Sequence, residues 1–279
     1  MRSMRWQYGW TVALLVAFAS AAAFAQDRPA DNDYQPTVGQ AGKDVIWVPT
    51  AQSLIDKMLD VARVRPNDFV IDLGSGDGRT VITAAKRGAR ARGIEYNPDM
   101  VELSKRNARN EGVSERTEFV KADIFESDFS DATVITMFLL TEINLKLRPK
   151  ILDLRPGTRI VSNTFTMGAW TADQIVVADN DCEHYCVAHF WIVPAKLEGR
   201  WQLGRGELTL KQSFQMISGT LRTDDGIVEI ANGRLEGVRL SFTAGDTEYV
   251  GYVKGERMEG IARGQSGSVD WTATALQRR

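Results

Sequence analysis

Three carboxylates at the ends of successive apolar segments are the residues of this sequence best suited to specific chemistry. Asp72 closes the first segment, Glu95 closes the second, and Asp123 follows the third. A carboxylate can accept hydrogen bonds from both hydroxyl groups of a ribose, which suits Glu95. It can also accept one from an adenine amino group, which suits Asp123. We therefore interpret the three acids as parts of one site for a nucleotide-like ligand.

A glycine-rich turn, Gly74-Ser75-Gly76-Asp77-Gly78, follows Asp72 and precedes a helical segment. Glycine is needed where the backbone must adopt a positive φ or approach a ligand closely. The GxGxG spacing differs from the GxGxxG of nicotinamide-binding domains, and an anionic pair flanking the turn suits a cationic sulfonium better than a pyrophosphate. In the plainer alternative, each acid is an ordinary helix cap or loop residue. That alternative could explain any one of the three acids, but it explains all three together poorly.

These motifs resemble those of the class I S-adenosylmethionine-dependent methyltransferases. The resemblance lies in the run from Asp72 to Arg79 and in Gly93-Ile94-Glu95-Tyr96-Asn97-Pro98. It implies a Rossmann-like fold with S-adenosyl-L-methionine as cofactor. The residues expected to bind that cofactor are Asp72, Gly74, Ser75, Gly76, Asp77, Gly78, Glu95, Tyr96, Asp123 and Ile124.

More narrowly, the chain is similar to the small protein-lysine methyltransferases related to those that modify the adenine nucleotide translocator and the c subunit of ATP synthase. The similar segments, within roughly residues 45 to 170, are Trp47-Val48-Pro49-Thr50, Asp123-Ile124-Phe125, Leu139-Leu140-Thr141-Glu142-Ile143-Asn144 and Leu147-Arg148-Pro149-Lys150. This implies a protein lysine amine as methyl acceptor, with a small molecule as the alternative. Those relatives tend to end the fifth strand in Ser-His-x-Phe, whereas this chain has Ser162-Asn163-Thr164-Phe165, so the acceptor and full activity stay open.

The resemblance also implies that residues 140–144 form a loop after the fourth strand that faces the acceptor. Methyl transfer from a sulfonium is an in-line displacement, so the protein mainly has to position the acceptor and remove its water. A lysine amine must first lose its proton, and apolar surroundings would lower its pKa. Glu142 is the first candidate to orient the amine or pass its proton to water, and Asn144 is the second, although a solvated charge or helix cap is the plainer interpretation of Glu142. No metal is required.

The elements that must position these residues alternate between short apolar runs and amphipathic segments, which is typical of a parallel sheet with helices on both faces. We expect residues 45–195 to form a Rossmann-like, seven-stranded methyltransferase domain. Its predicted helices cover residues 50–63, with Thr50 as N-cap, 79–87, and 98–110, which begins after Asn97. Its predicted strands cover residues 69–73, 91–96, 117–122, 132–139 and 158–164, with a closing antiparallel pair over 174–179 and 185–193.

The pattern changes after Ala195 to polar and apolar alternation, interrupted by glycine-containing turns such as Asp224-Asp225-Gly226. We expect residues 196–279 to form a separate antiparallel domain of about seven or eight short strands, closed into a small barrel or sandwich. Trp201 and Trp271 are expected to meet where the first and last strands close. The domain would recruit substrate or mediate other contacts.

The N-terminal residues 1–25 have the features of a signal peptide. Arg2 and Arg5 precede an apolar run that ends in Ala23-Phe24-Ala25, which predicts cleavage after Ala25 and export, to the periplasm in a bacterium. An uncleaved membrane anchor over residues 10–24 is the alternative, although a bilayer span needs about 20 residues. Residues 26–44 are expected to be a flexible linker.

Export conflicts with a cofactor that is made inside cells. The domain could be anchored and face the cytoplasm, an exported enzyme could find cofactor outside, or the fold could only bind a ligand. In a fourth account, the β domain does the work on a degenerate methyltransferase. The presence of all three acids speaks against degeneracy.

Charge and cysteine content restrict the partners. A net charge of -2 gives no excess of positive charge for phosphates, so nucleic acid is not expected as a partner. Cys182 and Cys186 could pair after export only if residues 183–185 turn, because residues four apart on a continuous strand are too distant. We expect two free thiols, and His184 and His189 as ordinary strand residues rather than metal ligands.

Overall fold

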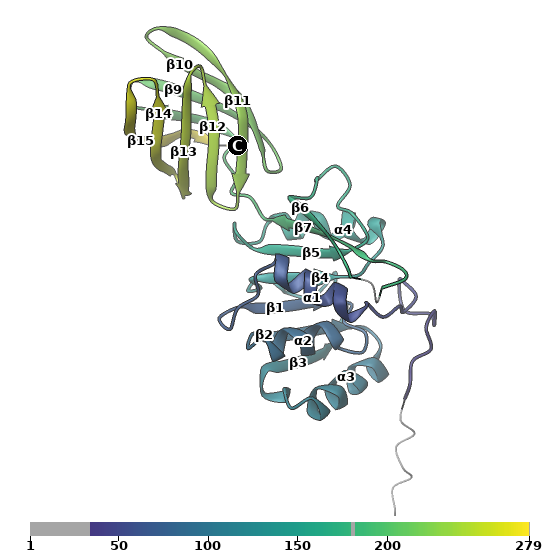
Figure 1. Cartoon of the computed structure of the whole chain (residues 1–279). Helices are drawn as coiled ribbons and strands as arrows, with labels where there is room; N and C mark the ends of the chain where they lie inside the picture. Colours follow the sequence, from purple (N-terminus) through teal and green to yellow (C-terminus); the bar gives the residue numbers. More distant parts are fainter. Residues whose placement is uncertain (1–33, 180–181, 279) are drawn as a thin grey trace, which may run out of the picture. The chain divides into compact units, whose positions relative to one another are not determined.

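The structure, a computed structural model, describes residues 34–179 and 182–278 (Figure 1). The predicted signal peptide, its alternative as a membrane anchor, and the first part of the predicted linker lie outside the described residues. Within the described ranges, no helix is both long enough and apolar enough to cross a membrane.

The first part of the described chain is a seven-stranded sheet in the order β3-β2-β1-β4-β5-β7-β6. Its strands are β1 (Phe69–Leu73), β2 (Arg90–Glu95), β3 (Thr117–Lys121), β4 (Val134–Met137), β5 (Arg159–Asn163), β6 (Gln174–Val177) and β7 (Val187–Ile192). β1 to β5 are parallel, and β7 is antiparallel to both β5 and β6. Every side chain of β1 and β4 is buried, as expected for central strands covered on both faces. The predicted Rossmann-like sheet and its closing antiparallel pair are confirmed.

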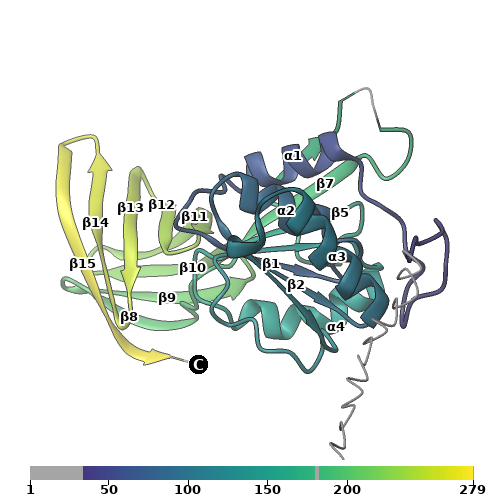
Figure 2. The same cartoon turned by 90° about the horizontal axis from the view of Figure 1, so that it is seen from below.

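Helices cover both faces of this sheet (Figure 2). They are α1 (Gln52–Val61), α2 (Arg79–Lys86), α3 (Pro98–Asn110) and α4 (Thr141–Leu152), with a 3-10 turn η1 (Ser114–Arg116) before β3. The first three helices pack in one apolar cluster with Val70 of β1, whereas α4 packs in another with Ile71. Successive residues of β1 therefore serve opposite faces, as the pleat of a strand requires. As predicted, α3 begins after Asn97, whose side chain accepts a hydrogen bond from the Asp99 amide at 2.9 Å.

Two local predictions were wrong. Thr50 does not cap α1, which begins at Gln52 after Ala51. The Thr50 hydroxyl instead accepts a hydrogen bond from the Asn163 amide nitrogen at 3.2 Å, and this bond joins the segment before α1 to the end of β5. The predicted loop at 140–144 is largely the first turn of α4, which buries an apolar row at helical spacing, Ile143, Leu147 and Ile151. A proline in the last turn of α4, Pro149, obscures this period in the sequence.

The rest of the chain forms a closed antiparallel barrel of eight strands, which confirms the barrel alternative. The strands are β8 (Gly199–Leu203), β9 (Gly206–Ser213), β10 (Met216–Thr223), β11 (Gly226–Glu236), β12 (Arg239–Ala244), β13 (Thr247–Lys254), β14 (Arg257–Gly264) and β15 (Gly267–Arg278). β15 pairs with β8 as expected, with Trp201 opposite Ala275. Trp201 and Trp271 are both buried in one apolar cluster, and the Trp271 ring contacts the rings of Phe242 and Tyr249. The barrel is thus filled by its own side chains.

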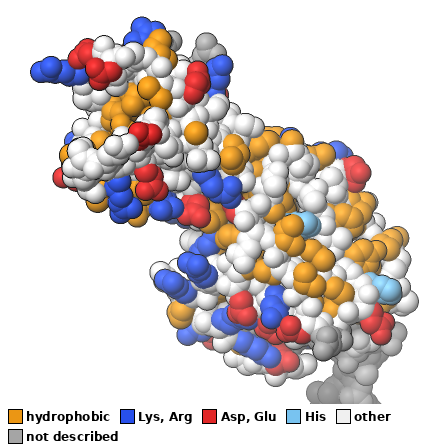
Figure 3. All heavy atoms as spheres, turned by 45° about the horizontal axis from the view of Figure 1, so that its top comes forward, with side chains coloured by type: hydrophobic (Ala, Val, Ile, Leu, Met, Phe, Trp, Pro, Cys, Tyr) orange, Lys and Arg blue, Asp and Glu red, His pale blue; other side chains and the backbone are white. Residues whose placement is uncertain are grey.

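The surface carries charges of both signs. On the face shown in Figure 3, acidic and basic side chains lie beside one another, with hydrophobic side chains between them. This mixture agrees with a net charge of -2 for the whole chain.

Candidate functional site

A cavity of about 510 Å³ lies at the carboxyl ends of the central strands. From β1 the chain continues to β2 and β3 on one side of β1 and then crosses to β4 and β5 on the other side. Ligands of open α/β sheets bind at such a switch point in the strand order. The predicted cofactor residues that line the cavity are Asp72, Gly74, Ser75, Gly76, Asp77, Glu95, Tyr96, Asp123 and Ile124. The remaining predicted residue, Gly78, is outside the lining.

Asp72 is a buried acid in the lining of this cavity, with 6% of its surface exposed. The pKa of its carboxyl is raised to about 7, mainly by burial and also by the nearby charges of Glu95 and Asp77, although a hydrogen bond from Thr136 opposes the shift. The Thr136 hydroxyl donates that bond at 2.6 Å from β4, the neighbouring strand. A cation bound beside this carboxyl would lower its pKa and favour its ionised form.

The glycine-rich turn has positive φ at Gly74, Gly76 and Gly78. A Cβ on Gly76 would lie 2.7 Å from the indole nitrogen of Trp47, so this glycine allows the turn and the Trp47 segment to approach each other. A Cβ on Gly78 would lie 2.8 Å from both Phe119 and Ser104. Gly78 is therefore needed for the packing of the helix start against its neighbours, which explains why it is absent from the cavity wall.

Glu95 is held in place by two backbone amides. Its Oε2 accepts a hydrogen bond from the Gly76 amide at 2.9 Å, and its Oε1 accepts one from the Asn97 amide at 2.9 Å. Each carboxylate oxygen keeps further lone-pair capacity for a ligand. The side chain is thus oriented at the end of β2 by the same turn that approaches the ligand.

The segment before α1 forms a wall of the cavity that the sequence did not predict. Residues 34–44 were expected to belong to a flexible linker, but Trp47 and Gln40 are paired by a backbone hydrogen bond of 2.9 Å, and Ala41 bridges to Ile46. Residues 40–50 all line the cavity. The apolar side chains from Val45 to Val48 were the available signal for an ordered segment.

Within this segment, Lys43 binds the predicted adenine acceptor. Its Nζ donates a hydrogen bond to Asp123 Oδ2 at 2.7 Å and lies over the rings of Tyr96 and Phe125. The hydrogen bond to Asp123 raises the pKa of Lys43, and the same bond lowers the pKa of Asp123. Asp123 is therefore an ionised acceptor, with its Oδ1 bound by the Phe125 amide at 2.9 Å.

The structure places the two predicted acceptor-side residues outside the cavity lining. Glu142 is exposed on the first turn of α4. Asn144 is buried, and its Nδ2 donates to Ser162 Oγ and to the carbonyl oxygen of Phe165, both at 3.2 Å. Asn144 thereby orders the chain after β5. The same helix start contributes Leu140 and Ile143 to the cavity instead.

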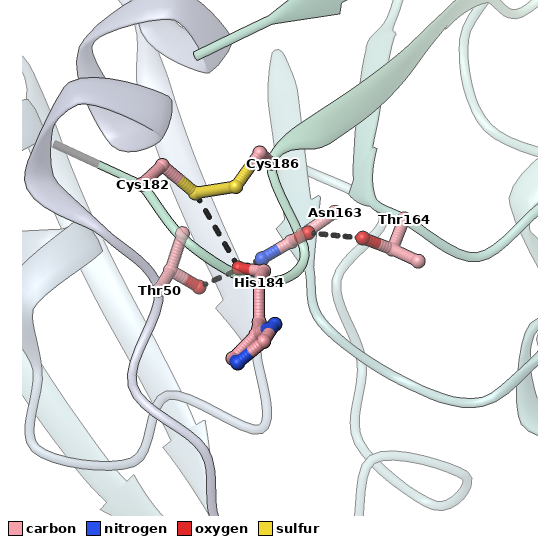
Figure 4. The surroundings of a disulfide bond; sticks show 6 residues. All are labelled: Thr50, Asn163, Thr164, Cys182, His184 and Cys186. Carbon is pink, nitrogen blue, oxygen red and sulfur yellow. Dashed lines mark hydrogen bonds between the residues drawn. A yellow bond between two sulfur atoms is a disulfide. The ribbon is translucent and has the colours of Figure 1, made fainter. Parts of the chain in front are cut away.

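Cys182 and Cys186 form a disulfide, so the expectation of two free thiols was wrong (Figure 4). Residues 183–185 make the bend that pairing requires, with Tyr185 at φ 57°, and the two Cα atoms are 5.7 Å apart. His184 lies in this bend, not in a strand, whereas His189 lies in β7. The bend shortens a separation that a continuous strand would have kept too long for a disulfide.

The residues lining the cavity fit S-adenosylmethionine. A Cβ on Gly74 would lie 3.2 Å from Leu139, so the bare backbone leaves room at this turn. Asp72, Glu95 and Asp123 offer acceptors for a cationic group, a ribose and an adenine amino group, in the order of their strands.

The chain matches the family model for the ANTKMT methyltransferase domain over residues 72–174. It is 42% identical over 144 residues to a protein-lysine N-methyltransferase of Saccharolobus islandicus, covering 50% of this chain and 89% of that relative. It is 34% identical over 130 residues to the lysine N-methyltransferase of Xenopus laevis that is named for the c subunit of ATP synthase, covering 46% of this chain and 57% of the relative.

Among solved structures, an RNA methyltransferase of Salinibacter ruber in complex with S-adenosyl-L-homocysteine matches with a TM-score of 0.50 and 43% identity. That match covers 54% of this chain and 96% of the other. All three similarities span about half of the present chain.

Proposed function

Since this chain belongs to the family of S-adenosylmethionine-dependent methyltransferases that includes the protein-lysine N-methyltransferase of S. islandicus, we propose that its acceptor is the ε-amine of a protein lysine. S-adenosylmethionine is the cofactor of this family and supplies a methyl group on a cationic sulfur. The observation that carries the proposal is the cavity wall shared by Asp72, Glu95 and Asp123, which continues past β4 into apolar side chains.

The mechanism assigned to this chain is one of binding and orientation. Glu95, fixed by two amides, would hold the ribose, and Asp123 would accept from the adenine amino group. Asp72, when ionised, would supply negative charge for the cationic part of the cofactor. Beyond β4, Phe138, Leu140 and Ile143 exclude water from the acceptor, which favours the neutral amine needed for attack. No metal is needed for this displacement.

The proposal is tested by calorimetric titration of S-adenosylmethionine into the full chain and into Glu95→Ala. We expect micromolar binding, weakened about 10- to 100-fold in the variant, because charge-assisted hydrogen bonds to the ribose are lost. Glu118→Ala removes an exposed carboxylate from the neighbouring strand and is the matched control. Equal affinity in Glu95→Ala and the control would contradict the assigned site.

The acceptor is then identified with cofactor carrying a radiolabelled methyl group, incubated with a protein extract and separately with RNA. Label recovered as methyllysine supports the proposal. RNA is the second candidate, because the S. ruber relative is named as an RNA methyltransferase. Label in RNA with none in protein would replace the lysine proposal.

We further propose export, with cleavage after Ala25. The proposal is supported by the signal-like sequence and by the Cys182–Cys186 disulfide, because disulfides persist in oxidising compartments. Cell fractionation followed by mass spectrometry of the mature N-terminus tests it. A membrane-bound chain that keeps residues 10–24 would favour the anchor instead.

A further inference from the structure

Three aromatic side chains form one continuous part of the cavity wall. Phe138 follows β4, Phe165 follows β5, and Tyr185 precedes β7. The ring centroids of Phe138 and Tyr185 are 5.3 Å apart in an edge-to-face contact. Phe165 lies 6.0 Å from Phe138 and 6.3 Å from Tyr185, so each ring contacts the other two. We call these three residues the aromatic wall.

The aromatic wall lies on the opposite side of the switch point from the cofactor acids. In the sheet order, Asp123, Glu95 and Asp72 belong to the ends of β3, β2 and β1, whereas the aromatic wall belongs to the ends of β4, β5 and β7. A ligand whose nucleoside binds the acids would therefore extend past β1 toward the rings. Aromatic faces attract cations and exclude water, and both properties suit the side chain of lysine.

Tyr185 occupies its place in the wall under conformational constraint. It is 44% exposed and has φ 57°, a left-handed conformation that tyrosine rarely adopts. Such conformations persist where the surrounding structure enforces them, and they cluster at functional sites. The bend that carries Tyr185 is closed by the disulfide between Cys182 and Cys186.

The end of the bend is anchored to the sheet. The Cys186 carbonyl oxygen accepts a hydrogen bond of 2.8 Å from the Ala178 amide, and the Val187 carbonyl oxygen accepts one of 2.7 Å from the Thr164 amide. Figure 4 shows the disulfide close to the hydrogen bond between Thr50 and Asn163, whose side chains lie beside the bend. Backbone hydrogen bonds thus fix the end of the bend that carries Tyr185.

We propose that the aromatic wall receives the side chain of the acceptor lysine, and that the Cys182–Cys186 disulfide positions Tyr185 within it. This inference rests on the proposed lysine acceptor. A dithiol reductant transfers two electrons and two protons to the disulfide, giving two thiols while the reductant becomes a disulfide. Reduction then frees the bend and weakens acceptor binding, while the cofactor acids are unchanged.

The test compares two ligands by calorimetry on the full chain. One is S-adenosylhomocysteine. The other is a bisubstrate probe, which is S-adenosylhomocysteine with its sulfur replaced by a nitrogen. That nitrogen also carries the side chain of lysine. In the oxidised chain, the probe should bind at least about tenfold more tightly than S-adenosylhomocysteine, because its added arm contacts the rings.

Dithiothreitol and, separately, Tyr185→Ala should each remove most of that advantage and leave the affinity for S-adenosylhomocysteine within about twofold. Tyr185→Phe should keep the advantage, because it preserves the ring. Tyr252→Ala, which removes an exposed tyrosine from the barrel, is the matched control. In the Cys182→Ser/Cys186→Ser variant, the probe should bind no more tightly than S-adenosylhomocysteine, and dithiothreitol should change neither affinity. This variant separates disulfide reduction from other effects of the reductant.

Two results would overturn the inference while leaving the cofactor site in place. In the first, S-adenosylhomocysteine binds but the probe has no advantage in the oxidised chain. In the second, the advantage survives both reduction and Tyr185→Ala. Failure of S-adenosylhomocysteine to bind at all would instead reject the proposed function, and the inference with it.

Discussion

At the scale of single residues, the cavity is defined by acids whose surroundings differ. Asp72 is buried and its pKa is raised to about 7, mainly by that burial. Asp123 has a lowered pKa because Lys43 binds it. The two carboxylates therefore respond differently to pH, and only Asp72 changes charge near neutrality. This makes Asp72 the residue whose ionisation is coupled to cofactor binding.

We predict that the affinity for S-adenosylmethionine increases about tenfold between pH 6 and pH 8. The cationic cofactor favours ionised Asp72. At a pH below the Asp72 pKa of about 7, binding must therefore release the proton of its carboxyl. Asp72→Asn should bind more weakly and show little of this pH dependence. Calorimetry in buffers of different ionisation enthalpy measures the released proton directly. Asp128→Asn, outside the cavity, is the control, and a pH dependence that survives in Asp72→Asn would contradict the assignment.

At the scale of elements, one buried carboxylate joins three central strands at their amino ends, opposite the cavity. Asp68, just before β1, binds Arg159 at the start of β5 and accepts a hydrogen bond of 2.8 Å from Thr133, just before β4. It also accepts one of 2.8 Å from the Arg65 amide. Burial by itself would raise the pKa of Asp68, but these partners outweigh it and lower the pKa below 3.8. The alignment of the central strands therefore depends on this group.

We predict that Asp68→Asn lowers the free energy of unfolding at pH 7 by about 1–3 kcal/mol, because Arg159 loses its charged partner. Because the folded pKa is lowered, the stabilisation by Asp68 is present above pH 3.8 and is lost as pH falls through the folded pKa. The difference in the free energy of unfolding between the variant and the parent should therefore decrease toward pH 3. Urea unfolding at pH 7, 5 and 3 measures it. Asp131→Asn, in an exposed ion pair, should change stability by less than about 0.5 kcal/mol.

At the scale of the whole molecule, the barrel contacts the sheet through specific polar and aromatic groups. Gln215, with 3% of its surface exposed, donates to the Thr171 carbonyl oxygen at 2.8 Å. Phe214 stacks on the buried Trp170 at a centroid distance of 6.0 Å. Arg234 binds Asp173, whose side chain is only 9% exposed. None of these residues lines the cavity, so the contacts contribute to stability rather than directly to the site. The boundary proposed between residues 195 and 196 thus separates two folds that share buried contacts.

We predict that Arg234→Ala lowers the free energy of unfolding by about 1–2 kcal/mol at pH 8, because Asp173 is left buried without its cation. Burial raises the pKa of Asp173, so its ionised form is costly in the folded chain and stability is lost as pH rises through that pKa. Without Arg234 the loss should increase, so the effect should be larger at pH 8 than at pH 4. Thermal unfolding at both pH values measures it, with Arg263→Ala in an exposed pair as control. Unequal cofactor affinity between the variant and the parent would contradict a purely structural role.

Local patterns of residues were enough to predict much of this protein. Buried strands such as β1 appear as short apolar runs, and α3 has a capping residue directly before its first turn. Acids at the ends of parallel strands necessarily share one edge of the sheet, so Asp72, Glu95 and Asp123 could be grouped from their positions in the sequence. Alternating residues and glycine turns similarly predicted the β domain and allowed its barrel form.

Packing between elements decided which distant segments complete the cavity, and this is visible only in three dimensions. Trp47 lies against Gly76 and Lys43 binds Asp123 because the chain before α1 turns back across the strand ends, and no local period encodes that return. The pairing of Cys182 with Cys186 likewise depends on a left-handed residue within the bend. Glu142 was expected at the acceptor but lies exposed, because α4 directs its apolar row inward. The physical reason is that periodicity fixes which face of an element is buried, whereas contacts between elements depend on how all of them pack together.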